Sequence, residues 1–171
     1  MSRAFLKNES ADDPVVIPAR APLPAGSVNY VTPRGLAMLR DELERLEKER
    51  TLAQTQFTDE NERTRQLALL NGQIAALNQR IATAKVVNMQ DHPLDEVRFG
   101  ATITLSSHGT GKADKQLTIV GVDEADVIHG RIAFPAPIAR LLLGRKIGDL
   151  ITLRTPQGEN VLEIKSISYN D

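Results

Sequence analysis

The fold follows from residues 36–84, LAMLRDELERLEKERTLAQTQFTDENERTRQLALLNGQIAALNQRIATA, in which apolar residues recur every three or four positions. A first apolar stripe consists of Leu36, Leu39, Leu43, Leu46, Ala53 and Phe57. A second apolar stripe consists of Leu67, Leu70, Ile74, Leu77, Ile81 and Ala84. This spacing predicts two helices whose apolar faces pack against each other.

An acidic segment, residues 58–62 with the sequence TDENE, separates the two stripes and predicts a turn. Steps of seven from Leu36 lead to Asn71, whereas the second stripe occupies Leu70, one residue earlier. One continuous helix would therefore carry a local stammer, whereas a chain that folds back buries both stripes within one molecule. We expect an antiparallel helical hairpin, a coiled coil, over residues 29–90.

The segments around the hairpin carry their own signals. Residues 1–28 contain four prolines and no periodicity, which predicts a disordered Pro/Ala-rich tail. Thr32 and Pro33 are expected to open the first helix as N-cap and first-turn proline. The second helix is expected to end near Val87, before Pro93.

From about Arg98 onward the periodicity changes from helical to alternating, which is typical of strands. Strands are expected at residues 101–105, 116–120, 130–134, 149–155 and 160–169. Pro137 and Gly144 bracket one short helix. The predicted fold class is therefore α+β, with a helical hairpin followed by a mostly antiparallel β-domain over residues 91–171.

Composition narrows the function classes. The net charge of −1 gives no electrostatic basis for binding free nucleic acid or an anionic membrane. The absence of cysteine excludes disulfides and thiolate zinc sites, so we expect a reducing cytoplasm. No apolar run approaches the length of a membrane span, and the N-terminus lacks the apolar segment of a secretory signal.

Six motifs follow one another in a fixed order along the chain. They are YVTPRGL at 30–36, GVDEAD at 121–126, PIARLLLG at 137–144, IGD at 147–149, TPQG at 155–158 and EIKSI at 163–167. In this order they resemble the bacterial Gre transcript-cleavage and elongation factors, as a member with a shortened hairpin. The resemblance implies that the β-domain is the family's FKBP-like polymerase-docking domain.

The resemblance also implies an activity. Gre factors are not enzymes by themselves, because they dock at the rim of the RNA polymerase secondary channel and stimulate the polymerase's own cleavage of backtracked RNA. Contact with nascent RNA and DNA is then limited to the elongation complex, and the factor is expected to be a monomer. It has no cofactor of its own, and any Mg²⁺ would be shared with the polymerase active site, as in two-metal phosphoryl hydrolysis.

The tip carboxylates are the candidate site residues that the resemblance implies. Asp59 and Glu60 are expected to direct the metal, with Glu62 as supporting charge. The tip departs from the family pattern, because Asp59 is followed directly by Glu60, and the arms are shorter by about seven residues each, or roughly 10 Å of reach. Helix capping by Asp59 and Glu62 is an alternative explanation that can coexist with the first. Arg63 and Arg65 are expected to face RNA or acidic groups of the polymerase.

The docking surface is expected just before and within the short helix of the β-domain. Its candidate partner-binding residues are Phe134, Pro135, Pro137 and Ile138. Pro135 stands where the family often has a polar residue, so apolar contact would replace a polar one. The alternative is that Ile138, Leu141 and Leu142 form the buried face of a short helix, which we expect for the two leucines.

Other motifs carry no function on inspection, and two other functions stay open. The box DEAD at 123–126 is typical of helicases, but no phosphate-binding loop accompanies it. The first alternative function is a regulator that occupies the channel and competes with cleavage factors without cleavage activity. The second is a coiled-coil adaptor that binds some other protein.

Overall fold

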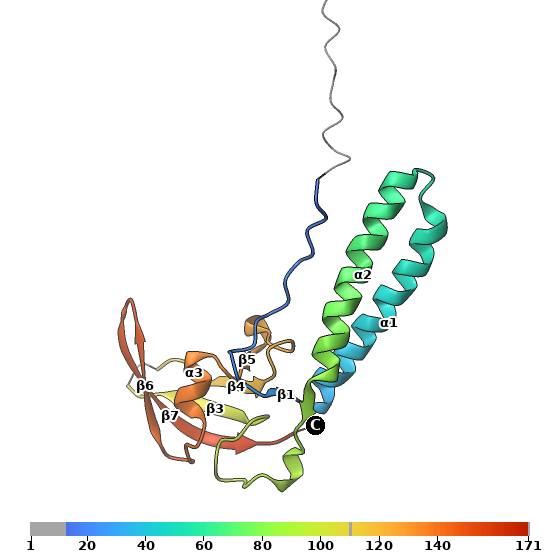
Figure 1. Ribbon diagram of the computed structural model, residues 1–171. Coiled ribbons are helices and arrows are strands. Elements are labelled where there is room, and N and C mark those ends of the chain that lie inside the picture. The colour runs from blue at the N-terminus through green and yellow to red at the C-terminus, as the bar shows by residue number, and fades with distance from the viewer. Residues whose placement is uncertain (1–12, 110, 171) are drawn as a thin grey trace, which may run out of the picture.

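The computed structural model describes residues 13–109 and 111–170. Two long helices, α1 (Pro33–Gln56) and α2 (Glu60–Ala82), form a hairpin that projects from a β-rich base (Figure 1). The predicted α+β class is confirmed, as is the chain reversal at the acidic segment. Glu60 and Glu62 lie in the first turn of α2, so the turn itself consists of residues 57–59.

The hairpin is held together by the two predicted apolar stripes. All twelve of their residues belong to one apolar cluster, in which Leu77 is fully buried and Leu39 and Leu70 are 2% exposed. Thr32 caps α1 as predicted, since its Oγ1 accepts a hydrogen bond from the N–H of Gly35 at 2.9 Å. The stripes pack within one molecule, as the phase slip indicated.

The predicted end of the second helix near Val87 is wrong. Helix α2 ends at Ala82, and β2 (Ala84–Val86) then pairs in parallel with β1 (Asn29–Val31). Thr83 is the C-cap, and both its N–H and its hydroxyl donate to the carbonyl of Gln79. The helix does not continue because the next residues, Ala84–Val86, pair with β1 instead. This strand pair ties the two ends of the hairpin to each other.

The base is a five-stranded sheet in the order β5-β4-β3-β7-β6. Its strands are β3 (Thr102–Ser107), β4 (Lys115–Val120), β5 (Arg131–Ala133), β6 (Leu150–Thr155) and β7 (Gly158–Ser168). All neighbours pair antiparallel except β4 and β5, and every strand lies within two residues of its predicted bounds. Helix α3 (Pro137–Leu142) packs on this sheet, and the short helices η1 (Met89–Asp91) and η2 (Val127–His129) join the elements.

Residues 13–28, here called the N-terminal arm, contain no helix or strand but follow the hairpin (Figure 1). The backbone oxygen of Asp13 accepts a hydrogen bond from Arg65, and that of Ala21 accepts one from Arg80. The arm therefore lies along α2 from near the tip to the base. The predicted disorder of residues 1–12 falls outside the described residues, and the predicted domain limits at 28 and 90 stay predictions.

Candidate functional site

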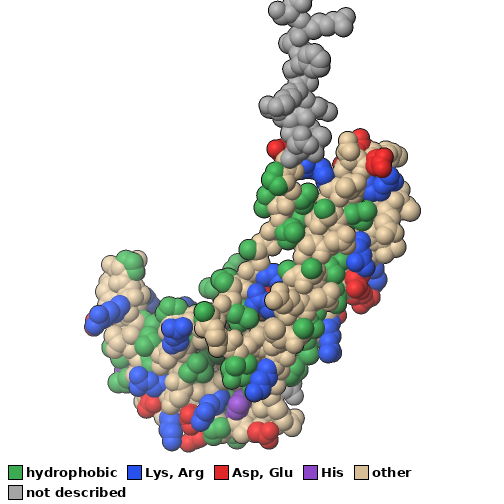
Figure 2. Space-filling model, viewed as in Figure 1, with side chains coloured by type: hydrophobic (Ala, Val, Ile, Leu, Met, Phe, Trp, Pro, Cys, Tyr) green, Lys and Arg blue, Asp and Glu red, His purple; other side chains and the backbone are tan. Residues whose placement is uncertain are grey.

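The tip of the hairpin carries the predicted carboxylates, and all three are exposed to solvent. Acidic side chains are visible at the tip in Figure 2. Asp59 is the N-cap of α2, and its Oδ1 accepts a hydrogen bond from the N–H of Glu62 at 2.9 Å. Glu60 and Glu62 occupy the first helical turn, where negative charge interacts favourably with the helix dipole. The capping interpretation of Asp59 is therefore confirmed, whereas a metal-directing role stays a prediction.

The tip offers oxygen ligands but does not assemble a metal site by itself. Carboxylate oxygens are the ligands that Mg²⁺ prefers. In the described part of the chain, no three acidic, histidine or cysteine side chains converge on a point that would hold an ion. The Asp59 cap uses one of that side chain's two oxygens, so Asp59 Oδ2 and the Glu60 carboxylate fit the role of single ligands to an ion held mainly by a partner.

The two predicted tip arginines are less available than the carboxylates. Both Arg63 and Arg65 are half-buried, and Arg65 Nη1 donates to the backbone oxygen of Asp13 at 3.1 Å. Arg65 therefore holds the N-terminal arm against α2 at Asp13, the first residue of the arm. A role of either arginine toward RNA or polymerase stays a prediction.

The predicted docking residues lie together around the N-terminus of α3, partly in the core of the base. Phe134 is half-buried against Tyr30 and Phe99, with ring centroids 5.8 Å away in both cases. Ile138 also packs partly against the core, while Pro137 is exposed and Pro135 is half-buried. Pro137 and the outer side of Pro135 therefore form the accessible part of this surface.

The two leucines of α3 have different environments. Leu142 is fully buried, as expected for the inner face of the helix. Leu141 is 39% exposed, so the prediction that it is buried is wrong. The reason is geometric, because consecutive residues on a helix differ by about 100° and cannot share one narrow buried face. Leu141 extends the accessible apolar surface beside Pro137.

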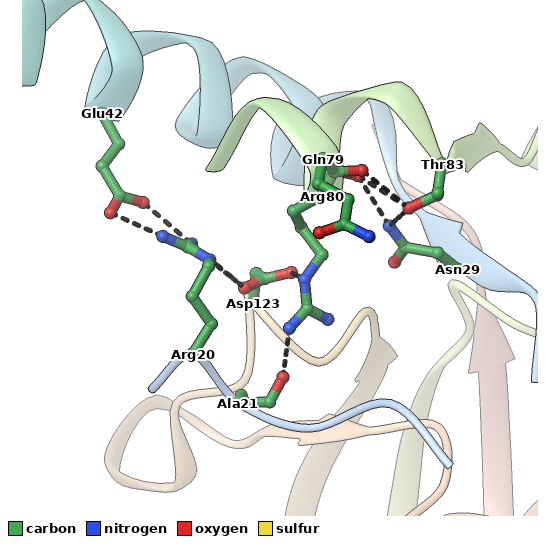
Figure 3. A network of polar contacts seen from close by, with 8 residues as sticks. All are labelled: Arg20, Ala21, Asn29, Glu42, Gln79, Arg80, Thr83 and Asp123. Carbon is green, nitrogen blue, oxygen red and sulfur yellow. Dashed lines mark hydrogen bonds and ion pairs between the residues drawn. The ribbon is translucent and has the colours of Figure 1, made fainter. Parts of the chain in front are cut away.

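A polar cluster that the sequence analysis missed joins the arm, the hairpin and the base (Figure 3). Asp123, dismissed above as part of a helicase-like box, pairs with Arg20 at 3.1 Å and with Arg80 at 3.5 Å. Its neighbour Glu124 is 5% exposed and accepts hydrogen bonds from Thr32 Oγ1 at 2.5 Å and from Arg34 at 2.8 Å. The acidic loop after β4 is thus the structural joint of the molecule.

Electrostatics in this cluster stabilise the ionised forms of Arg20 and Glu42. The hydrogen bonds of Arg20 to Glu42 lower the pKa of that carboxyl, and burial opposes the effect only in part. The same bonds raise the pKa of Arg20. Both groups are therefore charged at neutral pH. The sequence shows that a residue is charged but not which distant residue it pairs with, and for this reason the sequence did not predict the cluster.

The fold and the tip define a class of protein in which a rigid helical probe with a charged tip stands on a compact β-rich base. A family profile described as "Transcription elongation factor, GreA/GreB, C-term" matches residues 90–169. Transcription elongation factor GreA of Ralstonia nicotianae is 34% identical over 153 residues, covering 81% of this chain and 96% of that protein. The chain therefore belongs to the GreA/GreB family.

Other comparisons cover less of the relative or show weaker likeness. GreA of Anaeromyxobacter sp. (strain K) is 41% identical over 102 residues, which is 58% of this chain but 60% of that protein's length. Among solved structures, GreA/GreB from Nitrosomonas europaea is 23% identical, with a TM-score of 0.43. The match covers 82% of this chain and 98% of the Nitrosomonas chain. GreA factor homolog 1 of Thermus thermophilus is 20% identical, with a TM-score of 0.38, and the match covers 83% of this chain and 99% of the Thermus chain.

Proposed function

We propose that the protein binds RNA polymerase at its secondary channel and stimulates cleavage of backtracked RNA. In this proposal the base docks on the channel rim through the surface around Pro137, and the hairpin enters the channel. The protein is an accessory factor, and the cleavage belongs to the polymerase. It acts as a monomer in the cytoplasm, meets nascent RNA and DNA only in the elongation complex, and needs no cofactor of its own.

The observation that carries the proposal is the placement of exposed carboxylates at the far end of a stiff arm. Helix α1 has 24 residues and α2 has 23, so each helix spans about 35 Å at 1.5 Å per residue. The apolar cluster between the helices makes the arm rigid enough to deliver a ligand at a fixed depth. Asp59 and Glu60 are the groups delivered.

A magnesium ion shared with the polymerase would supply charge stabilisation to the attacking and leaving oxygens of the phosphodiester. The part of this chain is to present one hard oxygen ligand and to hold it still. The Glu60 carboxylate suits this part, and so does Asp59 Oδ2, the oxygen that the helix cap does not use. The turn residues preceding Asp59 hold the cap in place, since Phe57 packs into the hairpin cluster.

A second candidate function is supported by the same geometry. The cap occupies an Asp59 oxygen, and the family resemblance implies arms shorter than those of cleavage-competent factors by about seven residues each. A hairpin that fills the channel without reaching the catalytic ion would act as a regulator that competes with cleavage factors. Docking is common to both functions, and arm length and tip chemistry distinguish them.

The test is RNA cleavage in a stalled, backtracked elongation complex with wild-type protein and three tip variants. Asp59→Asn keeps an N-cap acceptor but removes the charge, whereas Asp59→Ala removes both. Glu60→Gln removes the charge of the remaining ligand. We expect stimulation by wild type and at least a tenfold loss of the cleavage rate for Asp59→Asn and Glu60→Gln. Glu47→Gln, an exposed change midway along α1, is the control.

The outcomes separate the functions. No stimulation by wild type, combined with competition against a known cleavage factor, assigns the channel-occupying regulator. A pull-down with core polymerase checks whether a tip variant has lost docking as well as cleavage. In the same assay, Pro137→Ala is expected to weaken binding several-fold, whereas Pro156→Ala in the exposed β6–β7 turn is not. Absence of any binding by wild type would leave the adaptor function instead.

A further inference from the structure

Arg20 of the N-terminal arm contacts the hairpin and the base at the same time. Its Nη1 and Nη2 atoms donate to the two carboxylate oxygens of Glu42 on α1, at 2.8 and 3.0 Å. Its Nε and Nη2 atoms also donate to Oδ1 of Asp123 in the base, at 3.3 and 3.1 Å. One guanidinium thus links three segments that are far apart in the sequence (Figure 3).

Arg80 on α2 contacts Asp123 from the opposite side. Its Nε atom lies 3.5 Å from Asp123 Oδ2, an ion pair rather than a hydrogen bond, and its Nη2 atom donates to the backbone oxygen of Ala21 in the arm. The side chain of Asp123 is 8% exposed and that of Arg80 11%. With Glu42 and Arg20 the cluster contains two cations and two anions, so its charge is balanced where solvent is mostly excluded.

An apolar contact fixes the arm further along α2. Gly72 lies in the middle of that helix, where glycine is unfavourable. A Cβ atom at Gly72 would lie 2.0 Å from Cδ1 of Ile17, so the side chain of Ile17 occupies the space that a larger residue would fill. The arm is therefore seated on the hairpin by shape as well as by charge.

We propose that the N-terminal arm is a latch that fixes the direction of the helical hairpin relative to the β-rich base, with Arg20 as its central positioning residue. Apart from the arm, the hairpin meets the base mainly at its lower end, through the ring contacts of Tyr30 on β1 with Phe99 and Phe134. The Arg80–Asp123 ion pair and the contacts of Glu124 with Thr32 and Arg34 lie at the same end. Contacts so near the pivot resist tilting weakly. Arg20 holds Glu42, which lies more than two turns along α1.

The length of the hairpin makes this direction matter. A tilt of about 10° at the base moves the tip of a helix about 35 Å long by roughly 6 Å. A displaced tip cannot present a metal ligand at a defined point. This consequence for the tip depends on the function proposed above, whereas the latch itself is a property of the free protein.

The latch can be tested without polymerase by measuring a distance within the full-length protein. The chain contains no cysteine, so Asn61→Cys at the tip and Ser166→Cys on β7, both exposed, provide two unique spin-label positions. Pulsed electron paramagnetic resonance then reports the distribution of tip-to-base distances. We expect a narrow distribution for the parent and at least a doubling of its width for Arg20→Gln.

Matched variants separate the latch from a general loss of structure. Arg154→Gln removes an exposed arginine that pairs with Glu159 in the β6–β7 hairpin, and it is expected to leave the distribution unchanged. Arg20→Lys keeps the charge but not the bidentate fork, and it is expected to give an intermediate width. Ile17→Ser keeps the ionic cluster and tests the packing contact alone. Circular dichroism confirms that each variant retains its helices.

A distribution for Arg20→Gln as narrow as that of the parent would overturn the latch, because the pivot contacts would then suffice. A broadened distribution in a protein that does not bind polymerase would sustain the latch while the proposed function failed. If both the latch and the proposed function are correct, Arg20→Gln is expected to reduce the rate of RNA cleavage several-fold with little change in docking on polymerase. Loss of docking in proportion to cleavage would count against a positioning role.

Discussion

Single side chains carry the joint between hairpin and base. The hydroxyl of Thr32 both accepts from the N–H of Gly35 at 2.9 Å and donates to Glu124 Oε2 at 2.5 Å. Glu124 is buried, so its carboxylate depends on these donors in place of water. The N-cap of α1 is therefore also a contact with the base, and one oxygen atom serves both.

We predict that Thr32→Ala destabilises the protein by about 1–3 kcal/mol, since it removes an N-cap and one partner of a buried carboxylate. Urea unfolding followed by circular dichroism measures the change. Thr32→Ser keeps the hydroxyl and serves as the control, with most of the stability retained. Equal losses for serine and alanine would indicate that the methyl group, not the hydroxyl, matters.

Gly72 is a second position at which one residue reports on the arm. In an isolated helix, Gly→Ala stabilises by about 1 kcal/mol. In this protein the new Cβ would meet Ile17, so we predict no gain for Gly72→Ala in the full chain. The gain should return in the background of Ile17→Ala.

A double-mutant cycle on thermal or urea unfolding measures this coupling between Gly72 and Ile17. The same stabilisation by Gly72→Ala in both backgrounds would show that the arm does not rest on α2 in solution. The result bears on the arm alone, because the three atoms nearest to a Cβ added at Gly72 all belong to Ile17 and none to the polar cluster.

At the scale of elements, the hairpin derives its stability from the two apolar stripes. Leu77 is fully buried between the helices, whereas Leu52 on α1 is 61% exposed. We predict that Leu77→Ala costs about 2–5 kcal/mol, through lost burial and a residual cavity. Leu52→Ala should change the stability by no more than about 0.5 kcal/mol.

Both leucine variants are compared by urea unfolding, with the helical signal at 222 nm reporting mainly on α1 and α2. A small effect of Leu77→Ala would mean that the hairpin can repack around the cavity. A large effect of Leu52→Ala would instead indicate that the outer face of α1 is covered in solution.

At the scale of the whole molecule, the arm, hairpin and base respond together to pH. The hydrogen bonds from Arg20 lower the pKa of Glu42 in the folded state, so folding favours its ionised form. The stabilisation is therefore present above the unfolded value of about 4.3 and is lost as the pH falls through the lowered folded value. Arg20 stays charged throughout, because its own pKa is raised.

We predict that the difference in unfolding free energy between wild type and Glu42→Gln is largest near pH 7 and shrinks below about pH 4. Urea titrations at several pH values measure it. Glu44→Gln, whose ion pair with Lys48 is exposed on α1, is the control and should show a smaller difference at pH 7. A difference for Glu42→Gln that does not vary with pH would show that the ion pair contributes nothing to folding.

Local pattern was sufficient to predict most of the elements. The apolar stripes indicated both helices and their mutual packing, and the alternating segments indicated all five strands of the base within two residues. Thr32 and Asp59 were recognisable as caps because capping depends on neighbours three residues away. The predicted end of α2 was wrong because Ala84–Val86 pairs with β1, a strand more than fifty residues away in the sequence.

The sequence by itself determined the hairpin, its turn, the β-domain and the acidic tip, because each depends on periodicity or on contacts within a few residues. Only the tertiary structure decided that the arm lies on α2 and that Arg20 meets Asp123, a residue 103 positions away. The physical reason is that an ion pair between distant segments depends on the relative placement of three folded elements. No periodicity along the chain records that placement.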